Sequence, residues 1–239
     1  MPHSTDLEYS ERAIPQYERA VSLAGGEPVR VPLGGSPQQL KDLIASSDAV
    51  LLPGSNADVD PSRFHQQKSK QTAAADLRRE AIDDLLLDDA YSHRKPILGI
   101  CYGLQSLNVF RQGSLIQHIP DFLPEATRGK VNHEAGKTVP VAHTVEISEK
   151  SQLAKLIANG TDAASPLIVP VNSSHHQSAD AIGEGLRIVA RCTDDSIIEA
   201  LEGTSPAHFV VAVQWHPERS VDDDEPSRAI FRALINATK

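Results

Sequence analysis

One cysteine of this chain lies where a protein is able to present a nucleophile. Cys101 sits in Gly99-Ile100-Cys101-Tyr102-Gly103, after an apolar run and before a helical pattern. The two glycines relieve crowding at a strained strand-to-helix turn, and the amides at the start of the helix favour a thiolate over a thiol. Cys101 is therefore a candidate nucleophile. A lone cysteine in an apolar run is more often a small buried hydrophobe, which is our interpretation of Cys192.

A general base follows a second apolar segment. Residues 211–215 have the pattern of a strand and lead into His216-Pro217-Glu218. Side chains two residues apart in extended backbone face the same way, and Pro217 fixes φ between them. A Glu218 carboxylate bound to one ring nitrogen of His216 leaves the other nitrogen to take the proton of Cys101. His-x-Glu alone is a weak signal, so this hypothesis depends on Cys101 lying nearby.

A third apolar run, residues 49–52, ends in Pro53-Gly54-Ser55. Such a sequence is often only a turn, but in open α/β sheets reacting groups gather where strands end. Backbone amides of Gly54, Ser55 and Tyr102 then converge on a developing oxyanion, and each such donor is worth roughly 100-fold in rate. The joint occurrence of the three strand ends supports a catalytic site.

The remaining pattern predicts an α/β fold in one domain, residues 1–239. A mostly parallel central sheet with helices on both faces is expected, together with a smaller antiparallel addition from residues 114–200. Apolar spacing predicts helices at residues 11–24, 37–46, 77–86, 102–112 and 226–237. Strands are expected at residues 28–33, 49–52, 96–100, 139–147, 167–171, 186–191 and 211–215. The acidic run 222–225 is interpreted as the solvated entry of the last helix.

Composition and charge argue against several classes of function. The chain has 239 residues and a formal net charge of -9 without a basic stripe, so we expect no nucleic-acid partner. No apolar run reaches the roughly 20 residues that span a bilayer, and residues 1–10 lack the pattern of an export signal. Two cysteines make no disulfide or metal framework. We expect a cytoplasmic protein that does not bind membranes.

Three motifs together resemble the class I glutamine amidotransferase-like superfamily: 52–55 (Leu-Pro-Gly-Ser), 99–105 (Gly-Ile-Cys-Tyr-Gly-Leu-Gln) and 214–218 (Gln-Trp-His-Pro-Glu). Further stretches resemble its gamma-glutamyl-gamma-aminobutyrate hydrolase branch of cysteine peptidases; they are 58–61, 107–109, 113–117 and 171–177 (Val-Asn-Ser-Ser-His-His-Gln). The resemblance implies a flavodoxin-like fold from about residue 13 to the C-terminus.

The resemblance also implies a mechanism. Cys101 is the nucleophile, His216 the base and Glu218 its orienting partner, with the amides of Gly54, Ser55 and Tyr102 as the oxyanion hole. The small-molecule substrate carries a gamma-glutamyl amide, which passes through a thioester and is hydrolysed without a cofactor. The loop 172–177 is expected beside the pocket, so the candidate substrate contacts are Gln105, Ser174, His175 and His176.

The chain departs from the family pattern in three places. Residues 1–10 cannot supply the expected first strand, so we predict unusual N-terminal packing or a homo-oligomer that covers the gap. Tyr102 stands where this branch commonly has arginine, and the sequence Gly99–Gly103 instead resembles that of the glutaminase half of guanylate synthesis enzymes. Glutamate at position 80 replaces an aspartate in the stretch 76–80, to which we assign no catalytic role.

Three alternatives remain open. The first is a glutaminase subunit that passes ammonia to a synthetase. The second is a degenerate relative that binds gamma-glutamyl metabolites without turnover. The third is a metal site built from Cys101, His176, His216 and Glu218, but their spacing fits no common zinc pattern, so we predict no metal. His133 and His143 are interpreted as ordinary surface residues.

Overall fold

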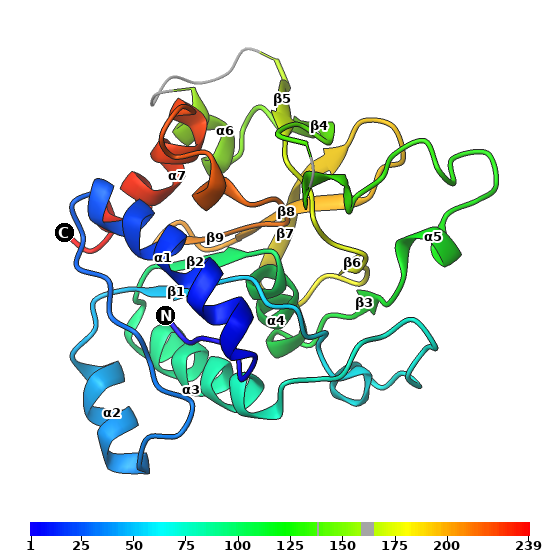
Figure 1. The fold of residues 1–239 in the computed structure, drawn as a ribbon. Coiled ribbons are helices and arrows are strands. Elements are labelled where there is room, and N and C mark those ends of the chain that lie inside the picture. The colour runs from blue at the N-terminus through cyan, green and yellow to red at the C-terminus, as the bar shows by residue number, and fades with distance from the viewer. Residues whose placement is uncertain (138, 159–164) are drawn as a thin grey trace.

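A mixed seven-stranded sheet organises the chain in the computed structural model, which describes residues 1–137, 139–158 and 165–239 (Figure 1). One half of the sheet is parallel and contains β1 (Val50–Leu52), β2 (Ile97–Ile100) and β9 (Val210–Val213). The other half is antiparallel and continues through β8 (Ile198–Gly203), β7 (Leu186–Cys192), β4 (His143–Ile147) and β5 (Leu167–Val171). A separate pair joins β3 (Leu115–Ile116) to β6 (Ser178–Ala179). The predicted α/β class is confirmed, with an antiparallel part that is larger than expected.

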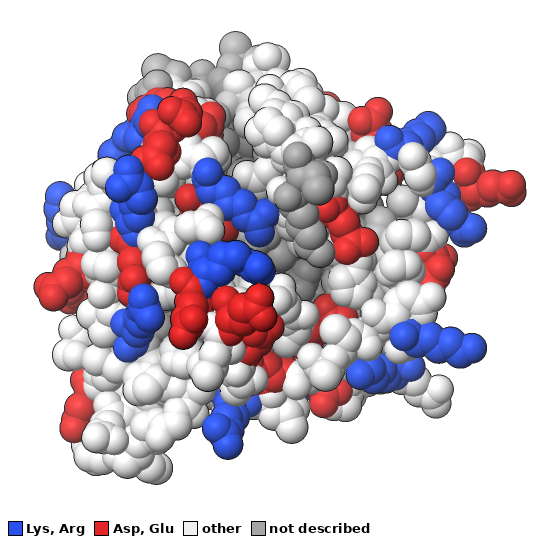
Figure 2. All heavy atoms as spheres, in the orientation of Figure 1, with Lys and Arg blue, Asp and Glu red and all other residues white. Residues whose placement is uncertain are grey.

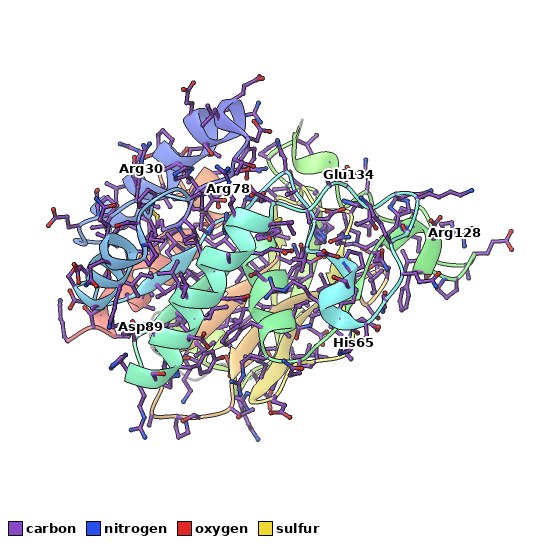
Figure 3. The ribbon with its side chains drawn as sticks, turned by 90° about the horizontal axis from the view of Figure 1, so that it is seen from below. Arg30, His65, Arg78, Asp89, Arg128 and Glu134 are labelled. Atoms are coloured by element: carbon purple, nitrogen blue, oxygen red, sulfur yellow. The ribbon has the colours of Figure 1, made fainter. Side chains whose placement is uncertain are left out.

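Helices cover both faces of the sheet because alternate strand residues point to opposite sides. α1 (Leu7–Leu23), α6 (Gln152–Ile157) and α7 (Glu225–Asn236) pack on the face that carries Leu51, Leu98 and Val211. On the other face α2 (Pro37–Ala45), α3 (Leu77–His93) and α4 (Tyr102–Phe110) pack against Leu52 and Ile97. Figure 3 shows α3 lying lengthwise along this second face, with Arg78 near its start and Asp89 near its end. The short helical turns are α5 (Ile119–Phe122), η1 (Pro61–Phe64), η2 (Ala135–Lys137) and η3 (Pro217–Arg219).

In the described part of the chain no strand precedes α1, as expected, and the N-terminal segment packs in an unusual way. Pro2 forms a single parallel bridge with Val31, the Met1 amine donates to the Val29 carbonyl at 2.9 Å, and the Val31 amide donates to Met1 at 2.7 Å. The strand predicted at residues 28–33 is therefore wrong. Pro28 and Pro32 bracket it and have no N–H to donate, which limits the ladder to one bridge.

Several boundaries also differ from the prediction. α1 begins four residues earlier than expected because Asp6 accepts a hydrogen bond from the Tyr9 amide at 3.0 Å and caps the helix. The predicted strand 139–147 begins only at His143, and the predicted strand 211–215 ends at Val213. The acidic run before α7 does serve as a helix entry, since Asp224 caps it. None of the helices in the described ranges is long and apolar enough to cross a bilayer.

Candidate active site

Cys101 occupies a strained turn between β2 and α4. Its φ of 53° and ψ of -106° lie in a region that L-residues with side chains rarely adopt, and its amide donates to the Val213 carbonyl at 2.8 Å. The flanking glycines make room for this turn. A β-carbon at Gly99 would lie 2.8 Å from the Gly103 carbonyl oxygen, and one at Gly103 would lie 2.1 Å from the carbonyl oxygen of Leu52. The sequence motif therefore has the backbone geometry of a nucleophile elbow.

His216 and Glu218 reach the same place from the end of β9. The His216 Nδ1 atom lies 2.7 Å from the Glu218 carboxylate, and both side chains are buried. Burial disfavours the charged imidazolium, but Glu218 and the neighbouring Cys101 outweigh it and raise the pKa of His216 to about 9. With Nδ1 bound to Glu218, Nε2 is the ring nitrogen that remains available for a proton.

Asn172 fixes the backbone of His216, a role that the sequence did not suggest. Its side-chain amide donates to the His216 carbonyl and accepts from the His216 amide, both at 2.9 Å. These two bonds join the loop after β5 to the loop after β9. His216 is thus held by its backbone as well as by Glu218.

The predicted oxyanion donors are not equivalent. The amide of Gly54 already donates to the Tyr17 hydroxyl at 3.0 Å. The amides of Ser55 and Tyr102 have no acceptor within the described ranges; Tyr102 is the first residue of α4, where helix amides are unpaired. Ser55 and Tyr102 are therefore the donors available to an oxyanion.

Arg79 supports the turn that carries these donors. Its fully buried guanidinium donates to the Pro53 carbonyl and to the Asp83 carboxylate, each at 2.7 Å, and lies 5.0 Å from the centre of the Tyr102 ring. Burial disfavours the charge, but Asp83 and Tyr102 hold the pKa of Arg79 above its usual value. This buried ion pair fixes the position of the turn at Pro53, and the absence of a catalytic role for residues 76–80 stays a prediction.

A cavity of about 530 Å³ opens beside the thiol and collects most of the predicted site residues. Its lining includes the predicted residues Cys101, Tyr102, His216, Glu218, Ser55, Gln105, Ser174, His175 and His176. α1 adds residues that the sequence did not indicate, namely Tyr9, Arg12, Ala13 and Gln16. A signal for them was missing because the first helix lies next to the pocket only in the folded chain.

The predicted substrate contacts already have partners. Gln105 donates to the Gln177 carbonyl and to the Gln214 side chain, both at 3.3 Å. Ser174 accepts from Arg219 at 2.8 Å, and His176 lies 3.0 Å from the Asp58 carboxylate. These groups are thus held in fixed positions around the cavity.

His175 differs from its neighbours. Its Nδ1 faces the Gln177 carbonyl at 2.8 Å and its Nε2 lies 3.5 Å from Glu199, so both ring nitrogens face the protein interior. The prediction that His133 and His143 are surface residues is wrong, because they are 5% and 7% exposed. His133 packs against both of the other rings, since its ring lies 4.7 Å from that of His143 and 4.8 Å from that of His175.

Charged side chains of both signs border the cavity. The basic residues are Arg12 and Arg219, and the acidic residues are Asp58 and Glu134. Figure 2 shows acidic and basic side chains interspersed on the face that carries α1, with no extended patch of one sign there. Such a surface does not indicate a nucleic-acid partner.

Comparison with known proteins decides the family. The model of the family described as peptidase C26 matches residues 2–218 of this chain. The chain belongs to the peptidase C26 family. A glutamine amidotransferase-like protein of Rickettsia prowazekii is 33% identical, over 93% of this chain and 88% of that protein. The gamma-glutamyl-gamma-aminobutyrate hydrolase of Escherichia coli K12 is 30% identical, over 93% of this chain and 84% of that protein. The resemblance seen in the motifs is confirmed.

A solved structure supports the same fold. The CTPS glutaminase domain of Trypanosoma brucei, with bound acivicin, aligns with a TM-score of 0.61 at 16% identity and covers 99% of this chain and 91% of that chain. At this identity the likeness concerns the fold alone. Membership of the peptidase C26 family makes the chain a hydrolase of amide bonds.

Proposed function

We propose that this protein hydrolyses gamma-glutamyl amide bonds with Cys101 as nucleophile, His216 as general base and acid, and Glu218 as the partner that orients His216. The observation that carries the proposal is one cavity that joins the strained Cys101 turn to the His216–Glu218 pair. Family membership and the hydrolase relatives support it. No metal or cofactor takes part in the chemical steps.

The reaction balances in two halves. The Cys101 sulfur attacks the gamma-carbonyl carbon, His216 holds the thiol proton, and the tetrahedral oxyanion lies toward the amides of Ser55 and Tyr102. His216 then gives the proton to the leaving amine as the C–N bond breaks, which leaves a gamma-glutamyl thioester. Water, deprotonated by His216, attacks the thioester and releases glutamate and the free thiol.

The charges around the cavity suit the glutamyl group. Its alpha-carboxylate requires cations, and Arg12 and Arg219 border the cavity. Its alpha-amino group requires an acidic partner, and Asp58 and Glu134 border the same space. We assign recognition of the zwitterion to these side chains and to the predicted contacts Gln105, Ser174 and His176.

The test is glutamate release from glutamine, gamma-glutamyl-aminobutyrate and gamma-glutamyl-anilide. We expect release from a gamma-glutamyl compound, its loss in Cys101→Ala, and its retention in the matched control Cys192→Ala, because Cys192 is buried away from the cavity lining. Release that survives in Cys101→Ala contradicts the proposal. Silence across the panel together with slow alkylation of Cys101 selects the degenerate binding protein.

A glutaminase subunit is the second candidate, favoured by the sequence Gly99–Gly103 and by Tyr102 in place of arginine. It predicts glutamate release from glutamine that appears only when a synthetase partner is added. In either case Cys101 has to remain a free thiol, and on this ground we propose a reducing compartment such as the cytoplasm.

A further inference from the structure

Four buried side chains converge outside the proposed chemical steps. His133 comes from the loop before η2, His143 begins β4, His175 lies in the loop after β5, and Glu199 belongs to β8. One ligand atom from each lies within 4.8 Å of all the others. The Glu199 Oε1 atom is 3.2 Å from His133 Nδ1, 3.4 Å from His143 Nε2 and 3.5 Å from His175 Nε2.

Within residues 1–137, 139–158 and 165–239, none of these converging atoms makes a hydrogen bond. The three facing ring nitrogens and both oxygens of Glu199 are buried without a hydrogen-bond partner. Buried polar atoms are rarely left in this state, and a cluster of five such atoms around one point requires an explanation. The cluster therefore points to a group that these atoms share.

The opposite ring nitrogens fix the tautomers. His133 Nε2 lies 2.9 Å from the Asp195 carboxylate, His143 Nδ1 lies 3.3 Å from the Thr144 carbonyl, and His175 Nδ1 lies 2.8 Å from the Gln177 carbonyl. These partners only accept, so the opposite nitrogen of each ring is the N–H donor. A ring whose facing nitrogen carries no proton then directs a lone pair toward Glu199. Three lone pairs and a carboxylate repel one another unless a cation lies between them.

We propose that His133, His143, His175 and Glu199 bind one divalent transition-metal ion, with Zn²⁺ as the expected occupant. Ligands at about 2.0–2.1 Å in a tetrahedron stand roughly 3.3–3.4 Å apart. The three nitrogen-to-Glu199 distances, 3.2, 3.4 and 3.5 Å, match that spacing. The acceptors behind the rings are the outer partners that metal-bound histidines ordinarily have, and Glu199 with Asp195 balances two positive charges.

A second grouping, His133 with Cys192 and Asp195, fits a metal less well. Asp195 already accepts from the Ile197 amide at 3.1 Å and from His133. Only three side chains converge in this second grouping, one fewer than a closed structural zinc site needs. A single proton on one ring is the other rival, and it would satisfy only one of the three facing nitrogens.

Four protein ligands in a buried place make a closed site, which is the structural type. The site would tie β4 and β8 to the loop that carries Ser174 and His176, the neighbours of His175 on the cavity lining. Figure 3 shows Glu134, next to the ligand His133, at the rim of the molecule. The metal would thus hold one wall of the cavity without touching the reacting atoms. This inference stands apart from the proposed function.

The test is metal binding by the full chain after removal of metals with a chelator. Zn²⁺ content is measured by mass spectrometry, and Co²⁺ is added for its visible spectrum. We expect one ion per chain and the intense bands of tetrahedral Co²⁺. Glu199→Gln and His143→Gln lose binding, whereas His93→Gln, at an exposed histidine, and Cys101→Ser keep it. Asp195→Asn weakens the affinity by about 10–100-fold through His133.

Failure is equally visible. Absence of stoichiometric metal in the reloaded wild type, or weak octahedral Co²⁺ bands, overturns the site. Metal that stays bound in Glu199→Gln and leaves in Cys101→Ser places it at the catalytic cysteine and also overturns it. Should the ligand variants fail to fold, the wild-type Co²⁺ spectrum and the anomalous scattering of a metal-loaded crystal still decide.

Discussion

At the scale of single residues, Glu218 controls the charge of His216. Glu218 and Cys101 raise the pKa of His216 to about 9 against the effect of burial. Glu218→Gln removes the negative charge and lowers that pKa, so less imidazolium is present to stabilise the Cys101 thiolate. At pH 8, where a His216 with a pKa of about 9 is still mostly charged, the rate of Cys101 alkylation by iodoacetamide should fall in step with the fraction of imidazolium that the substitution removes. Glu125→Gln, at an exposed glutamate, is the matched control and should leave the rate unchanged.

The sign of the pH dependence follows from the same pair. A raised pKa means that charged His216 stabilises the fold below its ordinary value of 6.5, and that this contribution disappears as pH rises through about 9. The difference in Tm between wild type and Glu218→Gln should therefore be largest below pH 6.5 and smallest above pH 9. A difference that grows with pH contradicts this assignment.

Tyr17 carries a second prediction at this scale. Its hydroxyl accepts the buried Gly54 amide at 3.0 Å. Tyr17→Phe leaves that amide without an acceptor and should cost about 1–3 kcal/mol of the free energy of unfolding, measured with urea. Tyr9→Phe is the matched control, because no hydrogen bond of the Tyr9 hydroxyl exists among the described residues. Equal losses in both variants would contradict a specific role of the Tyr17 hydroxyl.

Sequence motifs predicted residues whose role depends on neighbours in the chain. Cys101, His216 and Glu218 lie at strand ends, where the order of apolar and polar residues marks the position. Asn172 binds the backbone of His216 across 44 residues, and the candidate metal ligands at 133, 143, 175 and 199 have no short spacing. Such partners meet only after the sheet forms, so no local pattern indicates them.

At the scale of elements, the contact between α4 and β1 positions Cys101. A β-carbon at Gly103 would lie 2.1 Å from the Leu52 carbonyl oxygen, which neither backbone segment has room to avoid. Gly103→Ala should push α4 away and cost about 1–3 kcal/mol of unfolding free energy. Alkylation of Cys101 should also slow. Gly34→Ala is the control, since nothing lies within 4 Å of its added carbon. A Gly103→Ala variant as stable as the wild type would contradict the requirement for glycine at this contact.

Elements with strong periodic patterns were predicted well, and those with tertiary causes were not. α3, α4, α7 and the buried strands β1 and β2 follow their apolar patterns. The strand expected at 28–33 failed because proline removes two of its amides, and β8 was not predicted. The extent of the antiparallel half depends on pairing across loops, which period-two patterns do not specify.

At the scale of the whole molecule, the N-terminal segment replaces a missing strand with side-chain anchors. One oxygen of Asp76 accepts from the Thr5 amide at 2.7 Å, from the Thr5 hydroxyl at 2.9 Å and from Ser4 at 3.3 Å. The segment leads into α1, whose residues line the cavity.

The single domain over residues 1–239 and the homo-oligomer that would cover the gap remain predictions, and light scattering on the purified protein tests the second.

Asp76 therefore links the fold to the site, and Asp76→Asn tests the link. The other carboxylate oxygen caps α3 by accepting from the Arg79 amide at 3.1 Å. Asparagine has one acceptor oxygen and must abandon one of these two sets. We expect a loss of about 1.5–3 kcal/mol at pH 7, measured with urea, and faster hydrogen exchange in residues 1–23. Asp48→Asn, at an exposed aspartate, should change neither.

Acid should reduce the difference in the free energy of unfolding between the wild type and Asp76→Asn. Burial raises the pKa of Asp76, but hydrogen bonds from Thr5, Arg79 and Ser4 outweigh it and leave the pKa below its ordinary value of 3.8. A lowered pKa means that the charged carboxylate stabilises the fold above 3.8 and that this contribution is lost as pH falls further. The stability gap should thus close in strong acid. A gap that persists there would mean that packing, and not the charge of Asp76, anchors the N-terminal segment.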